Sequence, residues 1–395
     1  MAFRGSAPQI TWRAPGASEP SRQSRASVGL KILHIANEVV DTGNGICNSA
    51  VDLACHQAML GHDVWFVSSG GAYIDLLSRH RVSHFSIHQY PRDPIKLLAQ
   101  LSRLKHVVRT VRPDIVHAHM MTGAVLMHFG RALARFGDYG LVTTVHNEWR
   151  VASHLMRLGD RVITLSQSGK RQLMKRGFLD RKLRIVRPGV LNSPRCCTAT
   201  NIAVTAPDLP PSSTAILSVA SLYRRKGVGD LIEAFGIISE EFPNASLHIA
   251  GWGPDHVFFD RQRRGTRGGD RIHLLGFVPS PQMLLSRSQI FALASHADTF
   301  PLAVAEAREA GCAIISTEVG GVPELLDHGK AGLLVPPRDP QALAQALRRL
   351  LRDQQELGRW RQAARANLEW LTCDRMARET LEVYRSLLAH RSGSI

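Results

Sequence analysis

The sequence has no uncharged apolar run as long as the roughly 18 residues that a membrane span requires. The stretch 115–130 comes closest, but it contains His117, His119 and His128. Residues 1–27 are rich in Ser, Pro, Ala and Arg and lack the apolar segment of a secretory signal. We therefore expect neither an integral membrane protein nor a secreted one. We interpret residues 1–27 as a disordered tail, and an organellar transit peptide stays open as the alternative.

Cysteines are few and show no pattern of metal or disulfide use. None of the six forms a C-x-x-C pair, and their spacing does not suggest a disulfide framework: Cys47, Cys55, Cys196, Cys197, Cys312 and Cys373. This argues against a structural zinc site and fits a reducing compartment. The adjacent pair Cys196–Cys197 is interpreted as inert.

Aromatic residues make up only 6% of the chain, whereas its formal net charge is +16. Such a charge is typical either of a protein with an anionic partner, which can be nucleic acid, acidic lipid or a phosphorylated substrate, or simply of a basic, soluble surface. The basic residues are scattered and no RNA-recognition or helix-turn-helix pattern is present, so nucleic acid is the least favoured of the three.

The 395 residues suffice for two domains, and apolar segments alternate with helical ones along the chain. This alternation predicts an α/β fold with parallel, doubly wound sheets. The expected strands lie at 31–36, 63–69, 114–119, 141–146, 161–166, 215–222, 246–251, 271–277, 290–295 and 313–317. A Pro-, Ser- and Thr-rich stretch separates two such series, and ligands are expected in the cleft between the halves. We place a first domain at 28–191, a linker at 192–213, a second domain at 214–372 and a C-terminal helix at 373–395 that packs back on the first domain.

Residues 294–317 predict a strand end followed by a helix that begins near Pro301 and ends at Gly311. The N-terminus of such a helix binds anions, because its free N–H groups and its dipole point toward them. Asp298 precedes this helix and Glu306 lies within it. Carboxylates next to a bound phosphate are expected to face hydroxyl groups.

The frame D-T-F-P-L-A-V-A-E-A at 298–307 resembles the signature of retaining GT-B glycosyltransferases of family 4. The segments at 34–45, 113–119, 143–149, 217–235, 247–255, 272–279 and 319–326 stand in the order and spacing of that family. The resemblance covers about residues 30–390 and is most specific in the second half. It implies two Rossmann-like domains that face each other across a cleft and a nucleotide-diphospho-sugar as donor.

The resemblance implies roles for single positions. Glu306 is expected to bind the donor ribose and Asp298, where Glu is commoner, the sugar hydroxyls. Backbone amides at Leu302 and Ala303 are expected to meet the β-phosphate. His146 matches a histidine that the family places next to the donor sugar; His117 and His119 are weaker candidates, with His119 expected to face the cleft.

Lys226 matches the family lysine that neutralises the leaving diphosphate, but Ser221 stands at the position of the arginine that accompanies it. Arg224 and Arg225 are the candidate replacements. Cations at this place would stabilise the charge that develops on the leaving group.

Glycines let the backbone approach the donor closely at two turns. Gly43 and Gly45 follow the first strand, and Gly253 lies in the corresponding turn of the second half. Backbone groups near Phe277 and Val278 are expected to read the base.

The chain contains no D-x-D motif, which holds the divalent ion of another large class of glycosyltransferases. We therefore predict no metal and no cofactor beyond the donor itself. The resemblance further implies retention at the anomeric carbon. Because no carboxylate nucleophile is evident in the first half, departure of the leaving group on the face that the acceptor attacks is the favoured mechanism.

We expect a hexosyltransferase that uses a UDP- or GDP-linked donor and a glycan or lipid-linked acceptor, in cell-envelope or exopolysaccharide synthesis in the cytoplasm. Three alternatives stay open: an epimerase-like or phosphorylase-like relative, an inactive nucleotide-sugar-binding subunit, and a basic nucleic-acid-binding protein. Residues 94–112 form a basic amphipathic helix with Leu97, Leu101, Leu104, Val108 and Val111 on one face. Transient peripheral contact with an anionic membrane is one interpretation of this helix, and packing against the sheet is the other.

Overall fold

The computed structural model describes residues 29–41, 43–88, 94–133, 135–148, 150–196 and 214–393, with the backbone alone for 94–98. The expected tail 1–27 and most of the expected linker lie outside the described residues. None of the helices in this part of the chain is both long and apolar enough to cross a bilayer.

Strands form one parallel sheet in each half of the molecule. The first sheet has seven strands in the order β3-β2-β1-β4-β5-β6-β7. Their bounds are β1 Lys31–Ile35, β2 Asp63–Ser68, β3 Ser83–Ser86, β4 Ile115–Ala118, β5 Gly140–Val145, β6 Arg161–Thr164 and β7 Leu183–Ile185. The second sheet has six strands in the order β10-β9-β8-β11-β12-β13. Their bounds are β8 Thr214–Val219, β9 Ala245–Ala250, β10 Ile272–Gly276, β11 Ile290–Leu293, β12 Ala313–Thr317 and β13 Leu333–Val335.

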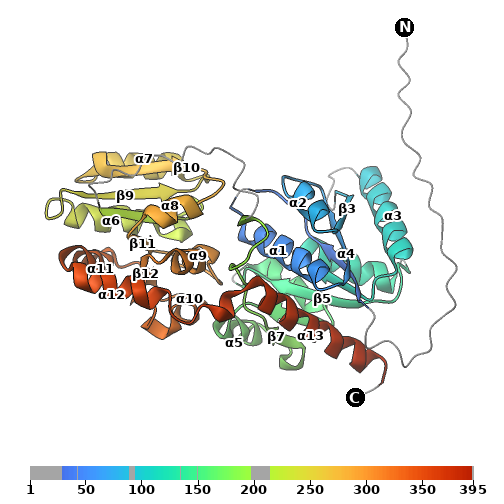
Figure 1. The fold of residues 1–395 in the computed structure, drawn as a ribbon. Coiled ribbons are helices and arrows are strands. Elements are labelled where there is room, and N and C mark those ends of the chain that lie inside the picture. The colour runs from blue at the N-terminus through green and yellow to red at the C-terminus, as the bar shows by residue number, and fades with distance from the viewer. Residues whose placement is uncertain are drawn as a thin grey trace, which may run out of the picture.

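Helices cover both faces of each sheet, and the two halves lie side by side (Figure 1). The helices of the first half are α1 Gly45–Met59, α2 Ile74–Arg79, α3 Pro94–Val111, α4 Met121–Ala132 and α5 Gln167–Lys175, with the 3₁₀ segments η2 Val151–Leu158 and η3 Asp180–Lys182. The helices and 3₁₀ segments that follow in the chain are η5 Arg224–Lys226, α6 Val228–Ile238, α7 His256–Arg264, η6 Gly269–Arg271, α8 Gln282–Arg287, α9 Leu302–Ala310, α10 Val322–Leu325, η7 Asp327–Gly329, α11 Pro340–Arg352, α12 Gln354–Ala364, η8 Glu369–Leu371 and α13 Cys373–Arg391.

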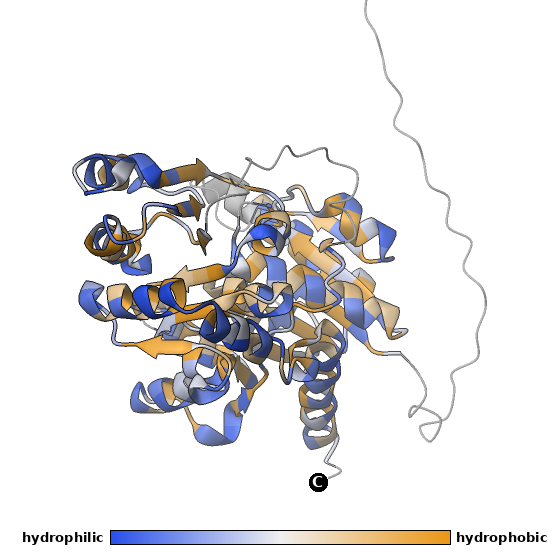
Figure 2. Ribbon diagram, turned by 60° about the vertical axis from the view of Figure 1, so that its left-hand side comes forward, coloured by the Kyte–Doolittle hydropathy of each residue, from blue (hydrophilic) through white to orange (hydrophobic). Residues whose placement is uncertain are grey.

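Alternation of side chains along the central strands explains this layering. In β1, Ile32 packs with the cluster that includes α1, whereas Leu33 packs with the cluster that includes α3 and α4. In β8, Ile216 and Leu217 divide between two clusters in the same way. Strands that are buried on both faces are apolar almost throughout, and Figure 2 shows them mainly orange between helices with blue outer faces.

The helix α13 lies far in sequence from the half on which it packs. Met376, Leu381 and Leu387 belong to the same buried cluster as residues of β1 and α1. The hydroxyl of Tyr384 lies 2.6 Å from Nδ1 of His117 in β4. The last helix therefore completes the core of the first half.

Candidate active site

A cleft of about 1290 Å³ lies between the halves, where the strands of both sheets end. Its lining includes most of the site residues predicted from the sequence: Gly43, Gly45, His146, Arg225, Lys226, Gly253, Val278, Asp298, Leu302, Ala303 and Glu306. Segments that follow β1, β5, β8, β9, β10 and β11 contribute these residues. The fold thus brings them into one place.

Two helix N-termini meet at this cleft. Asn44 caps α1 by accepting a hydrogen bond from the N–H of Ile46 at 3.1 Å. A Cβ placed on Gly45 would lie 3.7 Å from a methyl group of Leu302, so the first residues of α1 and α9 approach each other across the cleft. Both helices direct free N–H groups and positive dipole ends toward the same space. This arrangement suits a diphosphate.

The helix α9 begins one residue later than the sequence predicts. Pro301 is extended and precedes the first helical residue, Leu302, whereas Gly311 ends the helix in a left-handed conformation as expected. Pro301 therefore acts as the cap position, and the amides of Leu302 and Ala303 are the first ones without intrahelical partners.

Lys226 and Asp298, predicted for different parts of the donor, form an ion pair in this structure. Their side chains are 15% and 10% exposed, and the Ser295 hydroxyl donates to the same Asp298 oxygen at 3.3 Å. An ammonium group carries three N–H donors, so two remain for other acceptors. Lys226 can therefore hold Asp298 and reach a phosphate at the same time.

Of the two candidate replacements for the arginine at Ser221, only Arg225 lines the cleft, where Ser221 lies as well. The Arg225 guanidinium donates to the carbonyl of Ala297 at 3.5 Å. Arg224 instead stacks on Phe258, 3.9 Å from the ring centre. Arg225 is thus placed to supply the second positive charge.

Glu306 is 9% exposed, and burial raises the pKa of its carboxyl, while the charge of Arg195 acts in the opposite direction. Arg195 lies in the cleft and binds the buried Asp52 of α1 through contacts of 2.9–3.1 Å. Sequence reasoning missed Arg195 because it stands in a stretch without periodicity that we interpreted as linker.

Of the described histidines, His146 and His256 line the cleft, and His34, His117 and His119 are buried behind it. The Nε2 atom of His146 is buried without a hydrogen-bond partner among the described residues, and burial lowers its pKa to about 4. His117 and His119 do not line the cleft, contrary to the expectation for His119, because both are buried with His34 inside the sheet.

Three buried histidines have ring nitrogens close enough together to hold a metal ion: His34, His117 and His119. His34 bonds to His119 at 2.9 Å and to Gln57 at 2.8 Å, and His117 bonds to Tyr384 and Thr144 at 2.6 Å each. Only Nδ1 of His119 lacks a partner in the described chain. Protein hydrogen bonds therefore engage five of the six ring nitrogens of this cluster.

Comparison with known proteins identifies the family. The model of glycosyl transferases group 1 matches residues 205–367, and that of glycosyltransferase family 4 matches residues 43–191. A glycogen synthase of Mycobacterium tuberculosis is 30% identical over 302 residues, which are 70% of this chain and 69% of that protein. The chain belongs to the glycosyl transferases group 1 family.

Other relatives of this group 1 glycosyltransferase agree. The N-acetyl-alpha-D-glucosaminyl L-malate synthase of Bacillus anthracis is 24% identical over 338 residues, covering 79% of this chain and 85% of that protein. The structure of Anabaena HepE with UDP and glucose has a TM-score of 0.75 at 18% identity and covers 90% of this chain and 100% of that one. The predicted GT-B fold and the predicted transferase class are confirmed.

Proposed function

We propose that this glycosyltransferase moves a hexosyl group from a UDP- or GDP-linked sugar to a hydroxyl of a glycan or lipid-linked acceptor, with retention at the anomeric carbon. The observation that carries the proposal is the meeting of two helix N-termini with Lys226 and Arg225 in one cleft. HepE, which shares the fold, was solved with UDP and with UDP-glucose. Cell-envelope or exopolysaccharide synthesis in the cytoplasm is the setting we propose.

Positive charge in the cleft suits the departure of a nucleoside diphosphate. As the bond between the anomeric carbon and the β-phosphate oxygen breaks, negative charge grows on the phosphate. Lys226, Arg225 and the amides at Leu302 and Ala303 lie where they would stabilise it. We therefore expect the reaction to need no bound metal ion.

The two acidic residues of the cleft would bind hydroxyl groups of the donor. We assign Glu306 to the ribose and Asp298 to the sugar, next to the unpartnered Nε2 of His146. The acceptor oxygen bonds to the anomeric carbon on the face that the phosphate leaves, and its proton passes to the departing phosphate. A covalent glycosyl-enzyme found by mass spectrometry would contradict this mechanism.

A thermal-shift panel with UDP-, GDP-, ADP- and dTDP-sugars tests the donor site. A ligand at 100 times its dissociation constant should stabilise the protein by about 2.7 kcal/mol. We expect one nucleotide to produce this shift and Glu306→Ala to abolish it, because the ribose contact is lost. The Arg224→Ala variant is the control, since Arg224 does not line the cleft. A shift with none of the four donors would overturn the proposed function.

A further inference from the structure

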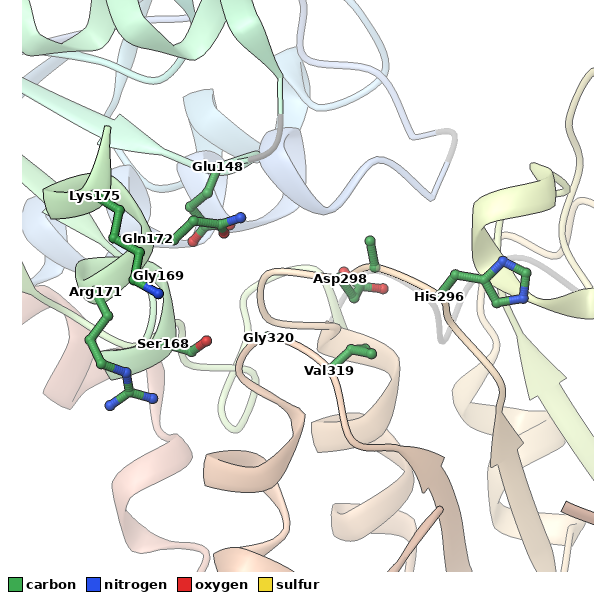
Figure 3. A pocket seen from close by; sticks show the side chains of 11 residues that line it. Glu148, Ser168, Gly169, Arg171, Gln172, Lys175, His296, Asp298, Val319 and Gly320 are labelled. Atoms are coloured by element: carbon green, nitrogen blue, oxygen red, sulfur yellow. The ribbon is translucent and has the colours of Figure 1, made fainter. Parts of the chain in front are cut away.

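A second pocket, of about 460 Å³, adjoins the donor cleft (Figure 3). The helix α5 forms one side of it, and the loops that follow β11 and β12 form the other. Among the described residues, Asp298 alone lines both the pocket and the cleft. A molecule in this pocket would therefore lie next to the place we propose for the donor sugar.

The pocket wall contains a buried carboxyl group with an unused oxygen. Glu148, in the loop after β5, is 2% exposed, and its Oε1 atom has no hydrogen-bond partner among the described residues. A Cβ placed on Gly169 of α5 would lie 2.3 Å from this oxygen, so only glycine leaves it room. Burial of an unsatisfied acceptor is costly, so a hydrogen bond to this oxygen would stabilise the protein.

Hydrogen bonding at the other oxygen indicates the protonation state of Glu148. The Thr299 hydroxyl lies 2.5 Å from Oε2 of Glu148 and 2.8 Å from the carbonyl oxygen of His146. A hydroxyl has one hydrogen, so both contacts are satisfied when a protonated Glu148 donates to Thr299 and Thr299 donates to His146. Burial and the charge of Asp298 raise the pKa of Glu148, which agrees with this arrangement. Oε1 then remains as a neutral acceptor suited to a hydroxyl group.

Positive charge lies on α5, on the same side of the pocket as Glu148 (Figure 3). Lys175 and Arg171 are exposed on α5, and in the described part of the chain neither has a hydrogen-bond or ion-pair partner. Asp298 is neutralised by Lys226. In Figure 3, Lys175 lies beside Gln172 on the α5 side, and the Ser168 hydroxyl points toward the loop of Gly320. The unpaired charges of the pocket are thus positive.

We propose that this pocket binds the acceptor and that the acceptor is a hydroxyl-rich molecule with a phosphate or carboxylate group. A hydroxyl of the acceptor donates to Oε1 of Glu148, and the anionic group binds Lys175, with Arg171 at the edge. This inference rests on the proposed function and adds the substrate class of the acceptor. A soluble anionic sugar and a lipid phosphate headgroup share this chemistry.

The test measures the release of nucleoside diphosphate from the donor selected by thermal shift. Glucose 6-phosphate, glucuronic acid and neutral glucose serve as soluble acceptor probes, and phosphatidylglycerol vesicles serve as the lipid probe. We expect charged probes to accelerate release more than glucose does. Acceleration by vesicles but by no soluble phosphate assigns the anionic group to a lipid and supports the proposal.

Variants separate the two contacts. Lys175→Glu should lower the ratio of kcat/KM for the charged probe to kcat/KM for glucose about tenfold or more. Arg181→Glu, an equal charge change at an exposed residue outside the pocket, should have no such effect. Glu148→Met should raise the acceptor KM several-fold, whereas Glu148→Gln, which retains a neutral acceptor and a donor for Thr299, should stay within about twofold of the wild type.

Two results would overturn the acceptor site. One is acceleration that is independent of probe charge, and the other is insensitivity of charged probes to Lys175→Glu. Urea unfolding and the donor-induced thermal shift show whether each variant is folded and still binds its donor. If donors bind but no probe is preferred, the acceptor inference fails while the proposed function stands; if no donor binds, the function itself fails.

Discussion

Single residues determine how much positive charge faces the leaving group, and Ser221 stands where the family resemblance implies an arginine. Arg225, four residues later, reaches the same cleft from η5. A guanidinium can donate two parallel hydrogen bonds to phosphate, whichever backbone position carries it. Arg225 is therefore placed where it could take the role of the missing arginine.

Arg225→Ala should reduce kcat by about 10²-fold, which is typical for the loss of one group that stabilises transition-state charge. Adding Ser221→Arg to this variant should restore at least about tenfold of the loss, because the new guanidinium arises within the same cleft. Steady-state kinetics with the selected donor measures both effects. If Arg225→Ala changes kcat less than twofold, Arg225 does not contact the diphosphate.

Residues whose placement depends on local sequence were predictable, and residues whose placement depends on tertiary neighbours were not. Asp298, Glu306 and Gly311 belong to one strand–helix segment whose spacing is visible in the sequence. Glu148 and Arg195 acquire their partners from residues 151 and 143 positions away, Thr299 and Asp52. No periodicity or motif reports such contacts.

Elements were predicted best where burial on both faces makes a strand continuously apolar. The strands β5, β9 and β12 are buried along their whole length and match the expected segments. The sheet-edge strands β3 and β13 and the three-residue β7 gave no such signal, because they are short and only partly buried. Helix α3 is the element whose sequence admitted two interpretations.

The apolar face of α3 packs against the sheet and is not available to a membrane. Leu104, Val108 and Val111 are at most 6% exposed and belong to the core cluster of the first half. Leu97 lies where side chains are not described. Arg103 and Arg109 remain exposed on the outer face, so any contact with anionic lipid would be electrostatic and would weaken with salt.

Vesicle sedimentation tests this contact. Arg103→Glu combined with Arg109→Glu should weaken binding to phosphatidylglycerol vesicles by about tenfold or more, since each basic residue near an anionic surface contributes about 1 kcal/mol. The matched control is Arg287→Glu with Arg359→Glu, two exposed positions of the second half. Equal weakening in both double variants would show that net charge alone, rather than α3, determines binding.

At the scale of the whole molecule, buried histidines link stability to pH. His34 is 0% exposed, and burial lowers its pKa to about 4 from an ordinary value of 6.5. His117 and His119 are shifted in the same direction by burial. Between these two pKa values the unfolded chain binds a proton that the folded chain excludes, so the free energy of unfolding falls as the pH falls.

For His34 alone, the linkage amounts to about 2 kcal/mol between pH 7 and pH 5. Urea unfolding of His34→Gln should therefore show a pH-dependent loss that is smaller by about this amount than in the wild type. His390→Gln, an exposed histidine near the end of α13, should retain the wild-type slope. Identical slopes for all three proteins would mean that His34 does not titrate on unfolding.

The position of α13 has a consequence for the order in which the molecule is built. Met376, Leu381, Tyr384 and Leu387 fill the core of the first half, although the entire second half is synthesised before them. On the ribosome, the first half therefore lacks these core side chains until the whole second half has been synthesised. The core of the first half is thus completed last, although this half is synthesised first.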